Sequence, residues 1–252
     1  MVFENHFSRV AGAYARFRPR YPEALFAALA ERAPSRKLAW DCGTGNGQAA
    51  EGLAAHFEEV VATDASAAQI AEARPHPRIH YRVTCAEGSG LADSSVDLIT
   101  VAQAVHWFDR PAFYREAERV LVPRGVLAVW CYGRLRMESP LDEMLVRFHQ
   151  ETVGPYWSPE RTLVEEGYRS LEFPFEEFAL PSFSVEKPMT IKELGGFLRT
   201  WSAVQCFIDQ RGFDPVERFL RALERAWGPV DQPRIMHWPL HVRAGERRPG
   251  RC

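Results

Sequence analysis

A glycine-rich turn placed directly after a short apolar segment is the feature that most restricts how this chain can fold. Leu38 to Asp41 has the character of a buried strand, and the segment that follows it carries glycine at positions 43, 45 and 47. Glycine lets the backbone turn sharply and approach a ligand closely, because it has no Cβ. A flat or chain-like ligand could lie across such a turn, and a tight turn with a purely structural role is the alternative.

Strand-like and helical segments alternate through the first half of the chain. The apolar runs are nearly continuous, which indicates strands buried on both faces. We therefore predict an α/β fold, a doubly wound, Rossmann-like and mostly parallel sheet covered by helices on both faces. The predicted strands are residues 38–41, 59–64, 80–84, 96–104 and 125–132, and the predicted helices between them are residues 48–57, 65–73 and 110–121.

Charge, hydropathy and cysteine content exclude several classes of protein. The formal net charge is −2, from 31 Lys and Arg against 33 Asp and Glu, so no overall positive field attracts nucleic acid. No segment approaches the ~20 consecutive apolar residues of a membrane-spanning helix. The five cysteines are scattered without a C-x-x-C pair, which favours reduced thiols over disulfides or a metal site. We expect a cytoplasmic protein without metal; the Arg-rich first 22 residues leave a mitochondrial presequence as the alternative.

The residues around the turn distinguish between nucleotide ligands. A dinucleotide-binding fingerprint that starts at Gly43 requires a third glycine where this chain has Gln48, and it needs no acid ahead of the turn. Asp41 instead favours a ligand with a cationic or amine-bearing part. Asp64, at the end of the second predicted strand, could accept both hydroxyls of a ribose, although this alone does not separate the two ligand types. Glu87 could flank an adenine ring or be a solvated loop acid.

Five ordered motifs resemble those of the class I S-adenosylmethionine-dependent methyltransferases. They are DCGTGNG, Asp64, Ala86-Glu87, the segment from Asp97 to Ala104, and LVPRGVLAVW, and the resemblance covers residues 38–132. It implies S-adenosyl-L-methionine as the cofactor, S-adenosyl-L-homocysteine as the product, and a seven-stranded sheet whose last strand is antiparallel. The cofactor-binding residues that it implies are Asp41, Cys42, Gly43, Thr44, Gly45, Gly47, Asp64, Ala65, Ala86, Glu87, Gln103 and Ala104.

A narrower resemblance reaches both ends of the chain. FSRVAGAYARFRPRYP, AVHWFD and RTWSAV are similar to the branch of that family that includes trans-aconitate methyltransferases. In that branch the N-terminal helix closes over the cofactor, which makes Tyr14, Arg18 and Tyr21 candidates to cover it, with Arg18 or Tyr14 suited to its carboxylate. The alternative is that these residues only cap the sheet.

The second half of the chain has a different pattern. It predicts helices at residues 141–151, 191–207 and 215–228, a strand with irregular flanks within residues 172–185, and a last strand at residues 235–242. No repeat or low-complexity linker interrupts the chain. We predict one methyltransferase domain over residues 1–245, followed by a tail, 246–252. Its predicted parts are an N-terminal helical lid (1–35), a cofactor-binding core (36–133), and cap helices with the last two strands (134–245).

The methyl acceptor is expected outside the carboxyl ends of the strands. His106 could be a base for an acidic hydroxyl or amine, or a hydrogen-bonded histidine that fixes its loop. An ionised carboxylate acceptor needs no base. Residues 102–105 lack the D/N-P-P-Y/F motif of enzymes that methylate nucleic-acid bases, which favours a small-molecule acceptor, a carboxylate among the candidates. The candidate acceptor-site residues are His106, Trp107, Trp130, Arg199 and Trp201.

Two other functions fit parts of the pattern. A nicotinamide-dependent oxidoreductase would share the sheet and Asp64, but Gln48 and Asp41 disfavour it. A protein that binds the cofactor without catalysis would keep the same fold and lack a closed acceptor cavity.

Overall fold

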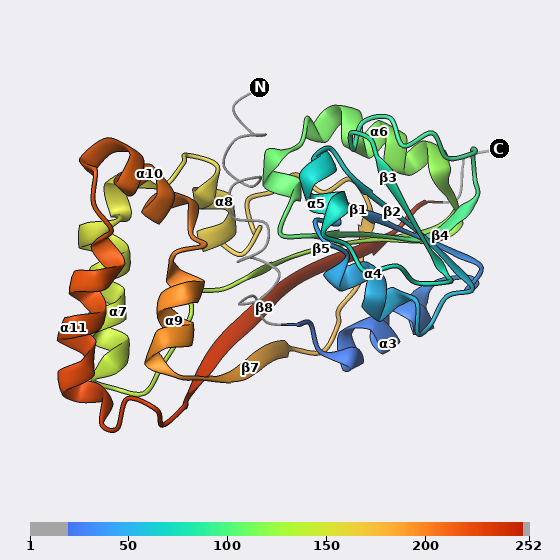
Figure 1. Ribbon diagram of the computed structural model, residues 1–252. Coiled ribbons are helices and arrows are strands. Elements are labelled where there is room, and N and C mark those ends of the chain that lie inside the picture. Colours follow the sequence, from blue (N-terminus) through green and yellow to red (C-terminus); the bar gives the residue numbers. More distant parts are fainter. Residues whose placement is uncertain (1–19, 249–252) are drawn as a thin grey trace. The chain divides into compact units, whose positions relative to one another are not determined.

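The computed structural model describes residues 20–248, which form two compact units (Figure 1). The first, here called the sheet unit, comprises residues 20–133, 162–184 and 239–248. The second, the helical unit, comprises residues 134–161 and 185–238. Among residues 20–248, no helix is both long and apolar enough to cross a membrane.

A twisted sheet is the centre of the sheet unit. Its hydrogen-bonded strands follow the order β3-β2-β1-β4-β5-β8-β6, and β7 also pairs with β8. The first five are parallel, whereas β8 is antiparallel to β5 and β6 is antiparallel to β8. The predicted α/β sheet, mostly parallel with an antiparallel last strand, is confirmed. The strands are β1 (Leu38–Cys42), β2 (Glu59–Asp64), β3 (Ile79–Val83), β4 (Val96–Ala102), β5 (Leu121–Tyr132), β6 (Glu176–Glu177), β7 (Phe183–Met189) and β8 (Arg234–Glu246).

The strand order changes direction next to β1. From β1 the chain moves outward to β2 and β3, then returns to β4 on the other side of β1. Connections therefore leave β1 and β4 in opposite directions, and ligands of open α/β sheets bind outside the carboxyl ends of the strands at this point. Asp41 of β1 lies beside Thr100 of β4 in the register, so the glycine-rich turn begins where the strand order changes direction.

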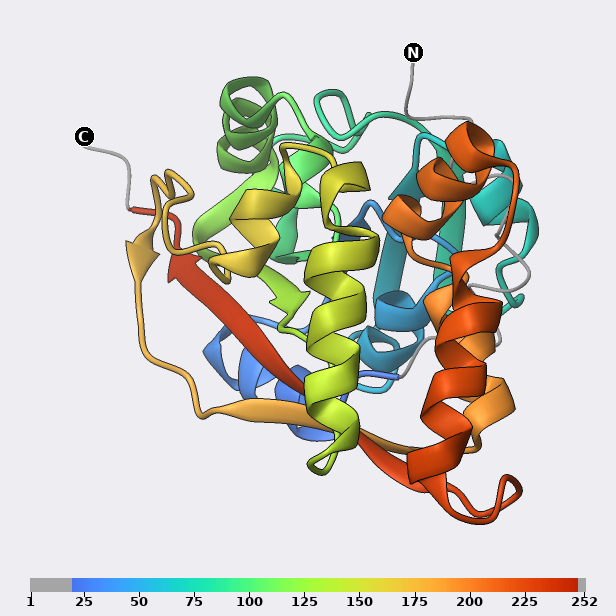
Figure 2. The same cartoon turned by 90° about the vertical axis from the view of Figure 1, so that its left-hand side faces the viewer.

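Helices cover both faces of the sheet. Helices α3 (Glu23–Arg32) and α4 (Gln48–Leu53) lie on one face, and α6 (Arg110–Val120) lies on the other (Figures 1 and 2). The short α5 (Ala67–Ala71) follows β2. A Cβ on Gly52 of α4 would overlap the ring of Phe26 in α3, so glycine allows these helices to meet closely. Helix α4 is shorter than the predicted 48–57, because turns replace the helix after Leu53.

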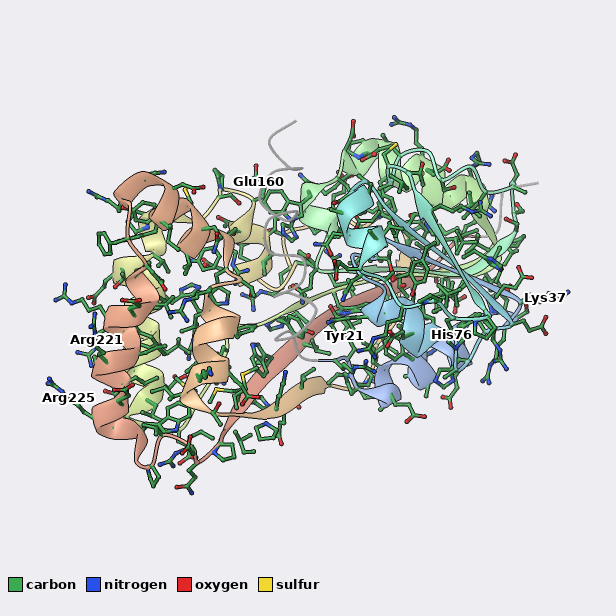
Figure 3. All side chains as sticks on the ribbon, viewed as in Figure 1. Tyr21, Lys37, His76, Glu160, Arg221 and Arg225 are labelled. Atoms are coloured by element: carbon green, nitrogen blue, oxygen red, sulfur yellow. The ribbon has the colours of Figure 1, made fainter. Side chains whose placement is uncertain are left out.

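The helical unit is built on amphipathic helices. Its elements are α7 (Leu141–Arg147), the π-helical turn η2 (Phe148–Thr152), the 3-10 turn η3 (Gly154–Tyr156), α9 (Ile191–Leu198), α10 (Ser202–Arg211) and α11 (Pro215–Trp227). The short α8 (Arg161–Glu165) follows residue 160. In α11 the apolar side chains of Val216, Phe219 and Leu223, spaced three and four residues apart, are buried. Arg221 and Arg225 project from the opposite side of α11 (Figure 3).

The single helix predicted over residues 191–207 is wrong, because α9 and α10 are separate helices. The chain leaves the helical conformation at Trp201, with φ −71° and ψ 132°. The hydroxyl of Thr200 donates a 2.6 Å hydrogen bond to the Phe197 carbonyl. This bond gives a partner to a carbonyl in the last turn of α9. The break buries the Trp201 ring against Phe148 and Phe197, and this packing outweighs local helix propensity.

Candidate functional site

The glycine-rich turn after β1 has left-handed backbone at each of its three glycines. The φ angles of Gly43, Gly45 and Gly47 are +69°, +57° and +91°. A Cβ on Gly43 would lie 2.6 Å from the Cβ of Ala104, and one on Gly47 would collide with Tyr81. Around Gly45, by contrast, the nearest atom is Gln69 Oε1, 3.7 Å from a Cβ built there. Packing within the described residues therefore requires two of the glycines, whereas residues 20–248 leave the space beside Gly45 open.

Asp41 organises this turn from inside the protein. Its side chain is fully buried, and its carboxylate accepts hydrogen bonds from the hydroxyls of Thr44, at 2.5 Å, and Thr100, at 2.7 Å. Burial raises the pKa of Asp41 to about 6, although the two hydroxyls oppose the shift. The sequence predicted a cationic part of a ligand near Asp41; here the side chain is fully buried and bonds to two threonines. We conclude that Asp41 shapes the turn through Thr44.

Two other predicted cofactor-binding residues near the turn, Cys42 and Ala65, differ in solvent exposure. Cys42 is fully buried, and burial raises the pKa of its thiol well above the usual value, so its side chain is no nucleophile. Any contact of Cys42 with a ligand would use its backbone. Ala65, which follows β2, is exposed.

Asp64 connects the end of β2 to the glycine-rich turn. Its Oδ2 accepts a 2.8 Å hydrogen bond from the backbone N–H of Gly45, and its Oδ1 accepts one of 2.8 Å from the backbone N–H of Ser66. Burial raises its pKa. Each carboxylate oxygen can accept a second hydrogen bond. The two oxygens are therefore able to receive a pair of vicinal hydroxyls next to Gly45.

Ala86 and Glu87 follow β3, as the sequence predicted. Ala86 is buried, and Glu87 Oε1 accepts a 3.0 Å hydrogen bond from the backbone N–H of Asp109. Asp109 in turn caps α6 by accepting from the N–H of Ala112. This carboxylate is thereby held between the end of β3 and the start of α6.

Gln103, directly after β4, combines backbone strain with an unpartnered amide. Its φ is +60°, a conformation that is costly for a residue other than glycine and that is found most often at functional sites. Its buried Nε2 has no hydrogen-bond partner among residues 20–248, and the same holds for Gln69 Oε1 beside Gly45. Leaving such groups unsatisfied costs ~1–3 kcal/mol each. These features mark the surroundings of the turn as a site prepared for a polar ligand.

His106 lies in the 3-10 turn η1 (Val105–Trp107) that follows Ala104. It is 8 % exposed, and its Nδ1 lies 2.8 Å from the hydroxyl of the fully buried Tyr168. The rings of His106 and Trp107 are 4.9 Å apart. This geometry supports the structural alternative, in which a hydrogen bond of His106 holds its loop in place. A role of His106 as a base stays a prediction. Tyr168 has no signal in the sequence, because it contacts His106 from 62 residues away.

Removing the Tyr168 hydroxyl should destabilise this loop. We expect Tyr168→Phe to lower the free energy of unfolding by about 1–2 kcal/mol, because the buried nitrogen of His106 loses a hydrogen bond. Urea unfolding measures this change. The same Tyr→Phe replacement at the partly exposed Tyr156, whose hydroxyl bonds to the exposed Arg211, should cost less. If the two variants lose equal free energy of unfolding, the buried hydrogen bond between Tyr168 and His106 contributes no more to stability than the exposed one of Tyr156.

Tyr21, predicted to cover the cofactor, packs on the sheet. It meets the fully buried Trp130 edge-on, with ring centroids 5.3 Å apart, and stacks on Tyr132 at 5.4 Å. This packing fits the alternative in which the residue caps the sheet. Tyr14 and Arg18 lie outside the described residues.

Arg199 and Trp201 belong to the helical unit, where each has partners of its own. Arg199 Nε donates a 2.6 Å hydrogen bond to Asp214 Oδ2. The Trp201 ring is 8 % exposed and lies 5.5 Å from the rings of His149 and Trp157. Contact of either residue with an acceptor stays a prediction. Across residues 20–248, no group of three or more His, Cys, Asp or Glu is arranged to hold a metal ion.

Comparison with known proteins gives consistent results. The family described as the methyltransferase domain matches residues 40–129. A protein of Dictyostelium discoideum, provisionally named as a methyltransferase, is 34% identical over 233 residues, which cover 91% of this chain and 89% of that protein. A solved structure from Anaeromyxobacter dehalogenans, provisionally named as a type II methyltransferase, is 44% identical with a TM-score of 0.87. The match covers 92% of this chain and 99% of the chain in that structure.

A more distant structure shares the fold alone. It is phosphoethanolamine N-methyltransferase 2 of Haemonchus contortus, solved with phosphomonomethylethanolamine and S-adenosylhomocysteine. Its identity is 16% and its TM-score 0.51, with coverage of 98% of this chain and 60% of that chain.

Proposed function

Because this chain belongs to the class I S-adenosylmethionine-dependent methyltransferases, we propose that it methylates a small molecule, with a carboxylate as the leading acceptor class. The observation that carries the proposal is the hydrogen bond between the backbone N–H of Gly45 and the carboxylate of Asp64. It places an acid suited to a ribose against a turn that a ligand can approach closely. Family membership also favours methyl transfer over the nicotinamide-dependent alternative.

The residues around the turn fit S-adenosyl-L-methionine. The cofactor supplies an activated methyl group on a sulfonium. Asp64 would accept the ribose hydroxyls, and Glu87 lies where the sequence predicts the adenine. The open space at Gly45 admits an elongated ligand against the main chain, and the unpartnered amide of Gln103 can donate to a carboxylate.

Methyl transfer requires mainly that the acceptor atom is aligned with the methyl group and that water is excluded from the site. No covalent nucleophile is required, and the buried thiol of Cys42 is held protonated. If the acceptor is a carboxylate, it attacks in its ionised form without a base. If it carries a hydroxyl or amine, His106 is the proposed base, with its ring held by Tyr168.

Two observations support a small acceptor. The net charge of −2 provides no general attraction for a polyanion. The Haemonchus contortus enzyme was solved with a small phosphorylated amine, so the shared fold accommodates acceptors of that size. We extend the proposal to the branch that includes trans-aconitate methyltransferases, with Tyr14 and Arg18 as the candidates to cover the cofactor.

We also propose a cytoplasmic location. Cys42, Cys85, Cys131 and Cys206, the cysteines within the described range, form no disulfide there, which fits a reducing compartment.

Methyl transfer can be tested before the acceptor is identified. The protein is incubated with S-adenosylmethionine labelled in its methyl group and a fractionated metabolite extract, and the labelled products are identified. We expect label in a low-molecular-weight compound. The melting temperature of the protein should rise when S-adenosylhomocysteine is added and should not change with NAD. Stabilisation by NAD alone, or label only in protein or nucleic acid, would refute the proposal.

Asp64→Ala tests the proposed ribose contact. We expect S-adenosylhomocysteine to bind about 10-fold more weakly, since losing a hydrogen bond to a charged group costs ~1.5 kcal/mol. Calorimetric titration measures the change. The exposed Asp231, replaced by alanine in the same way, is the control and should leave affinity unaltered. Unchanged affinity in Asp64→Ala would exclude the ribose from this carboxylate.

A further inference from the structure

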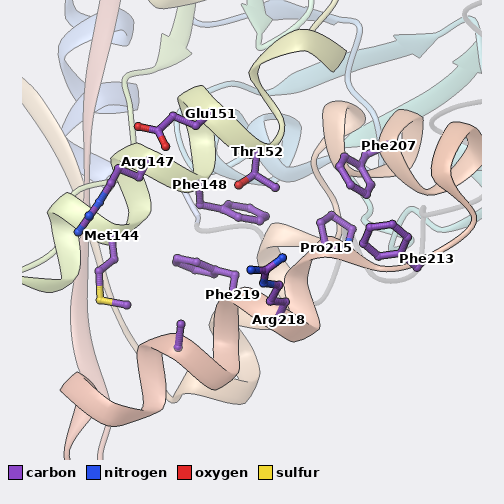
Figure 4. A pocket seen from close by; sticks show the side chains of 11 residues that line it. Met144, Arg147, Phe148, Glu151, Thr152, Phe207, Phe213, Pro215, Arg218 and Phe219 are labelled. Carbon is purple, nitrogen blue, oxygen red and sulfur yellow. The ribbon is translucent and has the colours of Figure 1, made fainter.

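The helical unit contains a pocket of its own, with a volume of about 510 Å³ (Figure 4). One wall comes from α7 and η2, the other from α11, and Phe207 and Phe213 close one end. Among residues 20–248, the lining comes from the helical unit, and no residue of the glycine-rich turn contributes to it. Its volume falls within the ~300–1,000 Å³ of typical small-molecule sites.

Helical spacing in the sequence produces both walls. Residues three and four apart share a helix face, which aligns Met144, Phe148 and Glu151 on one wall and Pro215, Phe219 and Ala222 on the other. The first wall changes from α-helix to the π-helical turn η2 at Phe148. Such turns are rare and often occur at functional sites. Here η2 contributes three of the lining side chains.

The interior of the pocket is aromatic. The rings of Phe148 and Phe219 stack with centroids 4.5 Å apart and 25° between their planes. The rings of Phe207 and Phe213 meet edge-on, with their centroids 5.1 Å apart. Phe213 is 57 % exposed, an unusual position for a large apolar side chain. A ligand that fills the pocket needs an apolar body.

The rim carries an excess of positive charge. Arg147 and Arg218 are exposed, and neither forms an ion pair with any residue between 20 and 248. Other arginines of the helical unit are paired, such as Arg134 with Asp142 and Arg199 with Asp214. Glu151 is the acid among the described lining residues, whose net charge is therefore +1. This charge matches a single anionic group.

We propose that this pocket binds an amphipathic monocarboxylate, with its apolar chain over the phenylalanines and its carboxylate between Arg147 and Arg218. A guanidinium is suited to this role because its planar N–H groups match a carboxylate. The site does not depend on methyl transfer, and it stands or fails independently of the proposed function.

Calorimetric titration with sodium decanoate, below its micelle concentration, tests the site directly. We expect one saturable site per chain, and we expect decyltrimethylammonium, which has the same chain and the opposite charge, to bind at least about 10-fold more weakly. The titration is repeated with saturating S-adenosylhomocysteine, which should leave decanoate affinity unchanged.

Three variants separate the chain from the head group. Ala222→Trp fills the pocket from an exposed helical position and should weaken decanoate at least about 10-fold. Arg147→Ala combined with Arg218→Ala should weaken it roughly 3- to 10-fold, the effect of losing two exposed charge interactions. Arg221→Ala combined with Arg225→Ala removes the same charge from α11 at two positions that do not line the pocket, and should change affinity less than about twofold (Figure 3).

Several results would overturn the proposal. Absence of saturable decanoate binding would do so, as would full affinity in Ala222→Trp. Equal losses in the two double-arginine variants would show a general charge effect. If Ala222→Trp alters the oligomeric state by light scattering while decanoate does not bind, the pocket is a surface for a second copy of the chain.

Discussion

A protein with Gly45→Val is expected to fold and to bind S-adenosylhomocysteine at least about 100-fold more weakly than the natural sequence. The branched side chain would occupy the open space over the turn, and no rearrangement within the protein makes room for the ligand again. The structure itself should tolerate the change, because the nearest atom is 3.7 Å from the new Cβ. The left-handed backbone, φ +57°, should cost ~1–3 kcal/mol of stability.

Gly212→Val is the matched control for strain. Gly212 caps α10 with φ +76°, and no atom of residues 20–248 lies within 4 Å of a Cβ built there. It should lose similar stability and keep full affinity, so calorimetric titration and urea unfolding of both variants separate strain from occlusion. If Gly45→Val binds within about threefold of the natural protein, the ligand does not lie against this turn.

Asp41→Asn is expected to stabilise the protein above pH 6, by up to about 3 kcal/mol. Burial raises the pKa of Asp41 from 3.8 to about 6, and each pKa unit corresponds to ~1.36 kcal/mol. Folding therefore favours the protonated acid. The penalty for burying the ionised form is absent below about pH 4, grows between pH 4 and 6, and stays constant above. Asparagine is neutral throughout, and it can accept from one threonine hydroxyl and donate to the other.

The difference in free energy of unfolding between Asp41→Asn and the natural protein should thus rise by about 3 kcal/mol from pH 4 to pH 7. Urea unfolding across this range measures it. Asp231→Asn, at an exposed position, is the control and should show a flat difference. A difference that falls as pH rises would mean that the buried carboxylate of Asp41 is stabilised in its charged form.

Local features of the sequence were sufficient to predict the sheet and most of the glycine-rich turn. Continuous apolar runs indicate buried parallel strands, and the acids at strand ends must meet at one edge of the sheet. The same pattern led to Asp64, which the structure places on the N–H of Gly45. Such predictions succeed because strand ends and tight turns depend on residues that are close in the chain.

Contacts between distant segments were not predictable in this way. Tyr168 reaches His106 from an irregular segment, and no periodicity in the sequence relates the two residues. The helix break at Trp201 depends on Phe148, 53 residues away along the chain, and the partner of Arg199 is set by the packing of α9 near Asp214. The inward bonding of Asp41 likewise depends on Thr100, from the neighbouring strand.

A crystal structure with S-adenosylhomocysteine tests the central claim most directly. We predict the nucleoside against residues 43–47, with the ribose hydroxyls on Asp64 and the adenine beside Glu87. The amide of Gln103 should gain a polar partner from the ligand. A structure in which the ligand binds elsewhere while the space over Gly45 stays closed by side chains would contradict this placement.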